Sequence, residues 1–190
     1  MNPYHLLKSN KSQGYIPLVN DNGRKLFGIL VVNKNNPINN PKELNGKTIA
    51  FPAPNALGAT LMVRADLKDK FNIQYKPRYV KTHPSVYLNV ILDQTSAGGG
   101  VLGTLNRQSI EIKNNLKVIH ETEKVSPHPF AVHPRVPQDV AKSVKEALLE
   151  IGESDQGKEW LRKTPISEIG VVNIESYYGL NKMNLERFLK

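Results

Sequence analysis

The sequence predicts an α/β fold arranged in two lobes, and three observations support this prediction. Segments with the pattern of strands alternate along the chain with segments of helical periodicity, which favours sheets covered by helices. Two polar connector zones, residues 33–45 and 121–128, indicate two lobes that are joined twice. A strand, a tight turn and a helix start follow one another between Leu44 and Ala59. We therefore expect a largely parallel sheet that binds ligands at the carboxyl ends of its strands.

The composition is that of a folded protein and excludes several classes of site. Of the 190 residues, 39% are hydrophobic and 23% charged, which is enough apolar material for a core. The absence of cysteine excludes disulfides, cysteine-ligated zinc and a thiol nucleophile. No apolar run approaches the roughly 18 residues of a membrane span, and the first residues lack the pattern of a secretory signal. The net charge of +9 attracts anions in general. Because the basic residues are scattered without interleaved aromatics, we expect no nucleic-acid partner.

The first elements are a helix and two strands. Pro3–Ser9 is expected to be helical, and the strands Tyr15–Val19 and Leu26–Asn33 flank the turn residues 20–23. This arrangement predicts a hairpin. Within the first connector, Pro41–Leu44 is expected to form a single helical turn, close to a hinge.

The middle of the chain has a strand, helix, strand pattern. Lys47–Phe51 is a predicted strand, Ala56–Phe71 carries apolar residues at helical spacing, and Tyr75–Val80 returns as a strand. A second helix begins at His83, and the Ala- and Gly-rich run Ser96–Gly100 is expected to interrupt it. The remaining expected elements are a helix, a strand, a segment that crosses between lobes and three further helices: 102–111, 116–121, 127–132, 138–150, 155–162 and 177–189.

The segment between Leu44 and Ala59 predicts an anion site. Backbone N–H groups at a helix N-terminus lack partners within the helix, and the helix dipole favours negative charge there. Asn55 is the expected N-cap, and Gly58 allows a ligand to approach the backbone closely. An ordinary capped helix that follows a strand is the alternative interpretation of the same pattern.

Other candidate motifs do not indicate an enzyme or a metal site. Gly98–Gly100 fits neither a phosphate-binding P-loop nor a dinucleotide fingerprint, so we expect close backbone packing there. No serine lies in a nucleophile elbow, and no carboxylates are paired on an evident face. His5, His120 and His133 have no spacing with carboxylates that suggests a metal. The sequence therefore predicts no catalysis, no metal and no cofactor.

Six short strings, in their order and spacing, carry a family resemblance that runs nearly from end to end. The chain resembles the phosphate/phosphite/phosphonate-binding family of periplasmic solute-binding proteins of ABC importers. The resemblance implies a type II periplasmic-binding-protein fold, in which two α/β lobes close over the ligand about a hinge. It also implies that the first lobe is incomplete, with residues 1–44 as the remainder of lobe 1, 45–125 as lobe 2, and 126–190 as the return to lobe 1. The strings are Asn2-Pro3-Tyr4, Gly14-Tyr15-Ile16-Pro17-Leu18, Leu44-Asn45-Gly46-Lys47-Thr48-Ile49-Ala50-Phe51, His83-Pro84-Ser85-Val86-Tyr87-Leu88-Asn89-Val90, Ala97-Gly98-Gly99-Gly100-Val101 and Pro127-His128-Pro129-Phe130-Ala131-Val132.

The resemblance also implies a set of ligand contacts. Tyr4 matches an aromatic residue that hydrogen-bonds the ligand, and His83 matches a ligand-contacting histidine. The four residues of the expected anion clasp are Asn55, Ala56, Leu57 and Gly58. Ala56 and Leu57 stand where the family has hydroxyl-bearing residues, so the clasp retains backbone N–H donors but lacks side-chain O–H donors. His128 is a weaker candidate, for which a rigid hinge bracketed by prolines is the alternative interpretation.

The expected function is that of the substrate-binding component of an ABC importer, which captures a small oxyanion such as phosphonate, phosphite or phosphate. Its expected partner is a membrane permease, and the resemblance implies a periplasmic location. Two alternatives stay open: a ligand-sensing module for a signalling partner, and a shortened form that no longer binds ligand. Family members have a signal peptide and a longer first lobe, so the chain is expected to be trimmed, truncated, or a short variant whose exposed sheet edge a partner or second copy covers.

Overall fold

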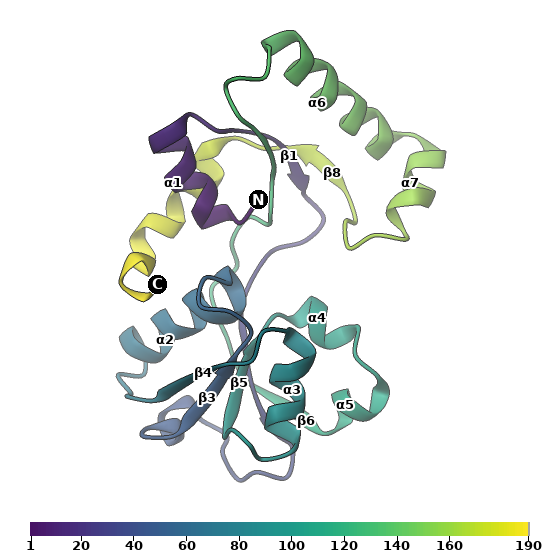
Figure 1. The fold of residues 1–190 in the computed structure, drawn as a ribbon. Helices are drawn as coiled ribbons and strands as arrows, with labels where there is room; N and C mark the ends of the chain where they lie inside the picture. Colours follow the sequence, from purple (N-terminus) through teal and green to yellow (C-terminus); the bar gives the residue numbers. More distant parts are fainter. Residues whose placement is uncertain (190) are drawn as a thin grey trace. The chain divides into compact units, whose positions relative to one another are not determined.

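A computed structural model describes residues 1–189 (Figure 1). These residues form two compact units. Unit 1 comprises Met1–Leu26 and Lys124–Lys182, and unit 2 comprises Phe27–Glu123 and the segment that begins at Met183. The sequence placed the first boundary at residue 44. The structure assigns residues 27–44 to unit 2 because the strand Ile29–Asn33 pairs within the sheet of that unit.

Unit 2 is built on a five-stranded mixed sheet of order β4-β3-β5-β2-β6. The central strand β5 pairs parallel with β3 and antiparallel with β2, while β4 is parallel to β3 and β6 is antiparallel to β2. The expectation of a largely parallel sheet is therefore wrong for two of the four strand pairings, because β2 alone runs against the other four strands. The strands are β2 (Ile29–Asn33), β3 (Thr48–Phe51), β4 (Lys76–Tyr79), β5 (Ala97–Gly100) and β6 (Leu116–Glu121).

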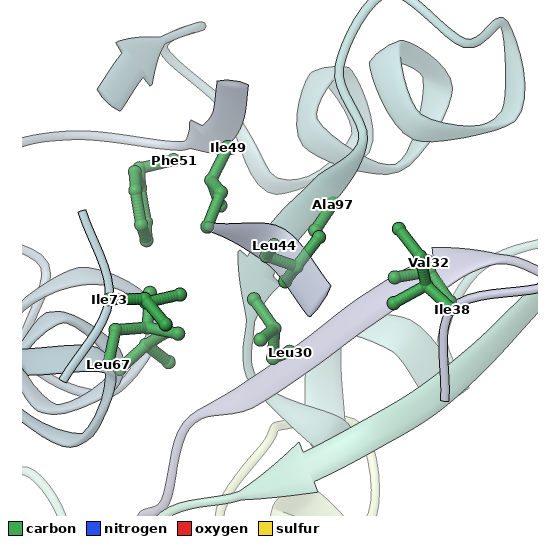
Figure 2. Packing of buried hydrophobic residues seen from close by; sticks show 10 residues of the cluster. Leu30, Val32, Ile38, Leu44, Ile49, Phe51, Leu67, Ile73 and Ala97 are labelled. Carbon is green, nitrogen blue, oxygen red and sulfur yellow. The ribbon is translucent and has the colours of Figure 1, made fainter. Parts of the chain in front are cut away.

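Two apolar clusters lie on the two faces of this sheet. The first joins the sheet to α2 (Val63–Asp69), which directly continues the helical segment η2 (Leu57–Met62), and Figure 2 shows side chains of this cluster. The second joins the opposite face to α3 (His83–Ile91). Successive strand residues point to opposite faces, so Leu30 belongs to the first cluster and Ile29 to the second. The sheet of unit 2 is thus covered by helices on both sides.

The glycine-rich run is a strand, not the helix interruption that the sequence suggested. Ala97–Gly100 forms β5 in the middle of the sheet, and all four of its residues are buried. A Cβ atom at Gly98 would lie 2.5 Å from Val86 of α3. The prediction of close backbone packing at the glycines is confirmed, because the neighbouring helix leaves no room for a side chain there.

Unit 1 contains an antiparallel three-stranded sheet of order β7-β1-β8. The strands are β1 (Ile16–Asp21), β7 (Phe130–Val132) and β8 (Ile169–Val171), and the helices are α1 (Pro3–Gln13), α6 (Gln138–Glu153) and α7 (Asp155–Leu161). The hairpin predicted between the first two strands is wrong, since β1 pairs on both edges with strands from the second half of the chain.

Two helix predictions also need correction. The helix expected at 102–111 is two short helices, α4 (Leu102–Asn106) and α5 (Ile110–Asn114). The surface helix expected at 177–189 is replaced by the 3₁₀ segments η3 (Ile174–Met183) and η4 (Leu185–Phe188), whose Tyr177, Leu180 and Leu185 are buried. Another 3₁₀ turn, η1 (Pro41–Leu44), lies where the sequence predicted it. Among the helices of residues 1–189, none combines the length and apolar character needed to cross a membrane.

Candidate functional site

The carboxyl ends of β4, β3 and β5, the three adjacent parallel strands of unit 2, lie along one edge of its sheet. The loop after β3 leads into η2, the loop after β4 leads into α3, and Val101 joins β5 to α4. The amide of Val80, just after β4, donates to the carbonyl oxygen of Phe51 at the end of β3, at 2.9 Å. Two helix N-termini therefore begin at neighbouring strand ends, which is where α/β sheets commonly bind ligands.

A π-helical turn follows β3 and continues directly as α2. The amides of Thr60 and Leu61 both donate to the carbonyl oxygen of Ala56, each at 3.0 Å. The amides of Leu57, Gly58 and Ala59 come before these bonds, so the helix itself offers them no acceptor. Ala56 caps this helix without a side-chain hydrogen bond, so the prediction of Asn55 as the N-cap is wrong.

Thr60 shapes this turn, and the sequence analysis did not single it out. Its hydroxyl donates to the carbonyl oxygen of Ala53 at 2.7 Å, and the residue is fully buried. This bond closes the loop between the strand and the helix. A threonine in the first turn of a helix, a few residues after a proline-containing loop, is the signal that could have indicated it.

The expected clasp offers main-chain donors rather than side-chain donors. Leu57 is only 2% exposed, so its side chain belongs to the core and only its amide is available to a ligand. Gly58 is buried, whereas Asn55 is exposed and Ala56 is half-buried. An anion at this clasp would therefore be bound by the peptide N–H groups that begin the helix, not by side chains.

His83 is the first residue of α3. Thr82 precedes it as the N-cap, and its hydroxyl oxygen accepts a hydrogen bond from the Ser85 amide at 3.2 Å. The Nδ1 atom of His83 is buried and has no hydrogen-bond partner in the part of the chain that the structure describes. Burial lowers the pKa of His83 from its ordinary value of 6.5, and the charge of Arg107 lowers it further. The imidazole is therefore mainly neutral near pH 7.

Arg107 is a second residue that the sequence analysis missed. It follows α4 directly, at the same edge of the sheet, and its charge lowers the pKa of both His83 and Tyr87, although burial makes the net shift of Tyr87 upward. Its side chain is exposed. An arginine one residue past a short helix that begins at a strand end is the signal that could have found it. Its positive charge makes this edge of unit 2 favourable for an anion.

The two other candidates from the sequence, Tyr4 and His128, lie in unit 1. Tyr4 is the second residue of α1, is 4% exposed, and has the Lys8 ammonium 5.6 Å from its ring centre. His128 is exposed in the loop before β7, and partial desolvation, followed by the charge of the Met1 ammonium, lowers its pKa. Asn55 to Gly58 and His83, in contrast, share one edge of unit 2.

Residues 1–189 contain no group of three or more histidine or acidic side chains placed to hold a metal ion. A partly buried His–Asp pair joins His120 Nε2 and Asp66 Oδ2 at 2.6 Å, and Lys70 also contacts Asp66 at 3.1 Å. The ring of Phe71 packs edge-on against His120 with 4.9 Å between ring centres. This arrangement ties α2 to β6 and gives no sign of a cofactor site.

Comparison with known sequences identifies the family. Residues 1–177 match the family described as the periplasmic substrate-binding protein of phosphonate ABC transporters. None of the curated protein sequences matches the chain significantly.

Solved structures share the fold at low sequence identity. A protein of Xanthomonas citri bound to ATP has a TM-score of 0.82 at 13% identity, and the match covers 99% of this chain and 78% of that one. A binding protein of an ABC phosphonate transporter from Pseudomonas aeruginosa has a TM-score of 0.78 at 13% identity, with 99% and 68% covered. PhnD1 of Prochlorococcus marinus in complex with methylphosphonate has a TM-score of 0.78 at 14% identity, with 95% and 74% covered. The fold is therefore the type II fold of periplasmic binding proteins. By the family match over most of its length, the chain belongs to the phosphonate-binding periplasmic substrate-binding proteins of ABC transporters.

Proposed function

We propose that this chain is a substrate-binding component that captures a small oxyanion of the phosphonate, phosphite or phosphate class. The observation that carries the proposal is the pair of helix starts at one edge of unit 2, together with the family match. The amides that begin η2 lack acceptors in their own helix, and the neighbouring helix begins with His83, whose Nδ1 has no partner in residues 1–189. Such donors suit the several oxygens of a phosphonyl group.

The chemistry of the proposed site is binding without bond breaking. Amide groups at a helix N-terminus and an imidazole N–H donate to the anion, and the helix dipole and Arg107 add positive potential. Tyr4 and His128 of unit 1 remain proposed ligand contacts, and a membrane permease and a periplasmic location remain the proposed setting. Delivery of the ligand to a permease is tested by growth of a strain in which this chain replaces a known binding component, with phosphonate as the only phosphorus source.

The direct test is a thermal-shift and calorimetric titration of the whole chain. The anions are methylphosphonate, phosphite, phosphate, sulfate and acetate at low salt, and sodium chloride controls for ionic strength. We expect a saturable rise in melting temperature with one class of oxyanion, and a weaker rise in His83→Ala. His5→Ala, which changes a histidine of unit 1 outside the proposed contacts, is the matched control. Identical small shifts with every salt would contradict the proposed function.

A further inference from the structure

Two glycines of the sheet lie directly beneath the π-helical turn. Gly28 precedes β2, and Gly99 belongs to β5. A Cβ atom at Gly28 would come 2.1 Å from the carbonyl oxygen of Gly58, and one at Gly99 would come 2.1 Å from the carbonyl oxygen of Ala59. Real Cβ contacts are not shorter than 3.0 Å, so a side chain at either position displaces the main chain of the turn.

Both glycines are firmly held. Gly28 donates its amide to the Thr122 hydroxyl at 2.8 Å and accepts from the Thr122 amide at 2.9 Å. Gly99 lies opposite Leu30 in the central strand pair. Because these main-chain positions are fixed, a new methyl group forces the turn, and not the sheet, to yield.

The contacts of these glycines with the turn also set the direction of the Ala59 N–H, a proposed ligand donor. In a trans peptide the C=O and the following N–H point in opposite directions. The carbonyl of Gly58 rests against Gly28, so the N–H of Ala59 points away from it. The carbonyl of Ala59 rests against Gly99, which fixes the next peptide plane, and the Thr60 amide of that plane bonds to Ala56 at 3.0 Å.

We propose that Gly28 and Gly99 are positioning residues of the oxyanion site, which aim the Ala59 amide at the ligand by seating the carbonyls of Gly58 and Ala59. The inference rests on the proposed function of this edge of unit 2. It assigns to the two glycines a role beyond close packing. Because glycine has no side chain, the first helical turn packs directly on the sheet, and this packing orients its peptide groups. Binding then depends on residues that do not touch the ligand.

The variants Gly28→Ala and Gly99→Ala test the proposal by titration of the full chain with methylphosphonate. Each is expected to bind about tenfold or more weakly, because an amide that points away loses its hydrogen bond to a charged ligand. The matched control is Gly98→Ala, whose Cβ meets Val86 and Val90 of α3 at 2.5 and 2.9 Å on the other face of the same strand. It introduces comparable crowding without touching the turn. Gly103→Ala controls for the effect of replacing a glycine without crowding, because its Cβ would meet only the Arg107 Nη1 atom within 4 Å, at 3.9 Å.

A second measurement starts with the wild-type chain, so its first result does not depend on whether the variants fold. In ¹⁵N–¹H spectra of the wild-type chain, methylphosphonate is expected to move the Ala59 amide proton downfield, and in a folded Gly99→Ala chain this shift is expected to be much smaller. An Ala59 resonance that the ligand leaves unchanged in wild type, or folded Gly28 and Gly99 variants that bind as tightly as Gly98→Ala, overturns this inference and leaves the proposed function standing. Absence of oxyanion binding by the wild-type chain overturns the proposed function and this inference with it.

Discussion

The hydroxyl of Tyr177 donates a hydrogen bond to the carbonyl oxygen of Pro127 at 3.1 Å, across 50 residues of sequence within unit 1. The same hydroxyl accepts a bond from Asn20 Nδ2 at 3.3 Å. Burial raises the pKa of Tyr177 to about 12, and the bond from Asn20 opposes this rise. One side chain thus joins η3, β1 and the loop before β7.

Tyr177→Phe tests this junction. The change leaves the Asn20 amide and the Pro127 carbonyl without their partner, and we expect it to lower the free energy of unfolding by about 1–3 kcal/mol. Urea unfolding followed by circular dichroism measures the loss. Tyr178→Phe is the matched control because Tyr178 is 49% exposed, and an equal effect of the two changes would contradict the assignment.

Thr60→Val removes the bond from the Thr60 hydroxyl to Ala53 while it preserves side-chain shape. We expect a loss of about 0.5–1.5 kcal/mol in stability, because the Ala53 carbonyl loses the bond from the Thr60 hydroxyl and keeps the longer one from the Ala56 amide, at 3.3 Å. We also expect weaker oxyanion binding, since the loop before the π-turn is released. Thr60→Ser keeps the hydroxyl and should recover most of the affinity. Calorimetry of both variants with methylphosphonate decides the question, and equal affinities would count against a role for the hydroxyl.

Arg64 of α2 anchors η4 to the rest of unit 2. Its guanidinium donates to the hydroxyls of Tyr75 and Tyr79 at 3.1 and 2.9 Å and lies 4.7 Å from the ring centre of Phe188. Arg64→Lys keeps the charge but loses the planar fork, so we expect a loss of about 1–2 kcal/mol in unfolding free energy.

The control for this change is Arg78→Lys, at an exposed position of β4. Chemical unfolding of both variants measures the difference. If the two substitutions are equally mild, the guanidinium of Arg64 contributes no more than its charge.

His83 predicts a pH dependence of stability. Its folded pKa lies below the ordinary 6.5, so between these two values the unfolded chain binds a proton that the folded chain does not. The contribution of His83 to stability is therefore complete above pH 6.5 and falls as the pH decreases through this window. Melting temperatures measured from about pH 7.5 to 5 should decline less steeply in His83→Gln than in wild type. Parallel curves would show that His83 does not titrate as described.

Local patterns in the sequence determined much of unit 2. The strand Thr48–Phe51, the strand Lys76–Tyr79 and the helix that begins at His83 were predictable because strand propensity and helical spacing are local properties. The resemblance carried by short strings also indicated the family, which the match over residues 1–177 shows. Gly98–Gly100 was correctly expected to lie where backbones pack closely.

Only the tertiary structure decided the pairing of strands and the roles of particular residues. The turn at residues 20–23 has the composition of a hairpin, yet β1 pairs with β7 and β8, which both come from the second half of the chain. Sequence could not show that Gly28 lies beneath Gly58, since only the fold brings these two residues together. The sequence by itself determined most of the local elements and indicated the family. Long-range packing determined which strands are neighbours and how the π-helical turn lies on the sheet, because these depend on contacts between distant parts of the chain.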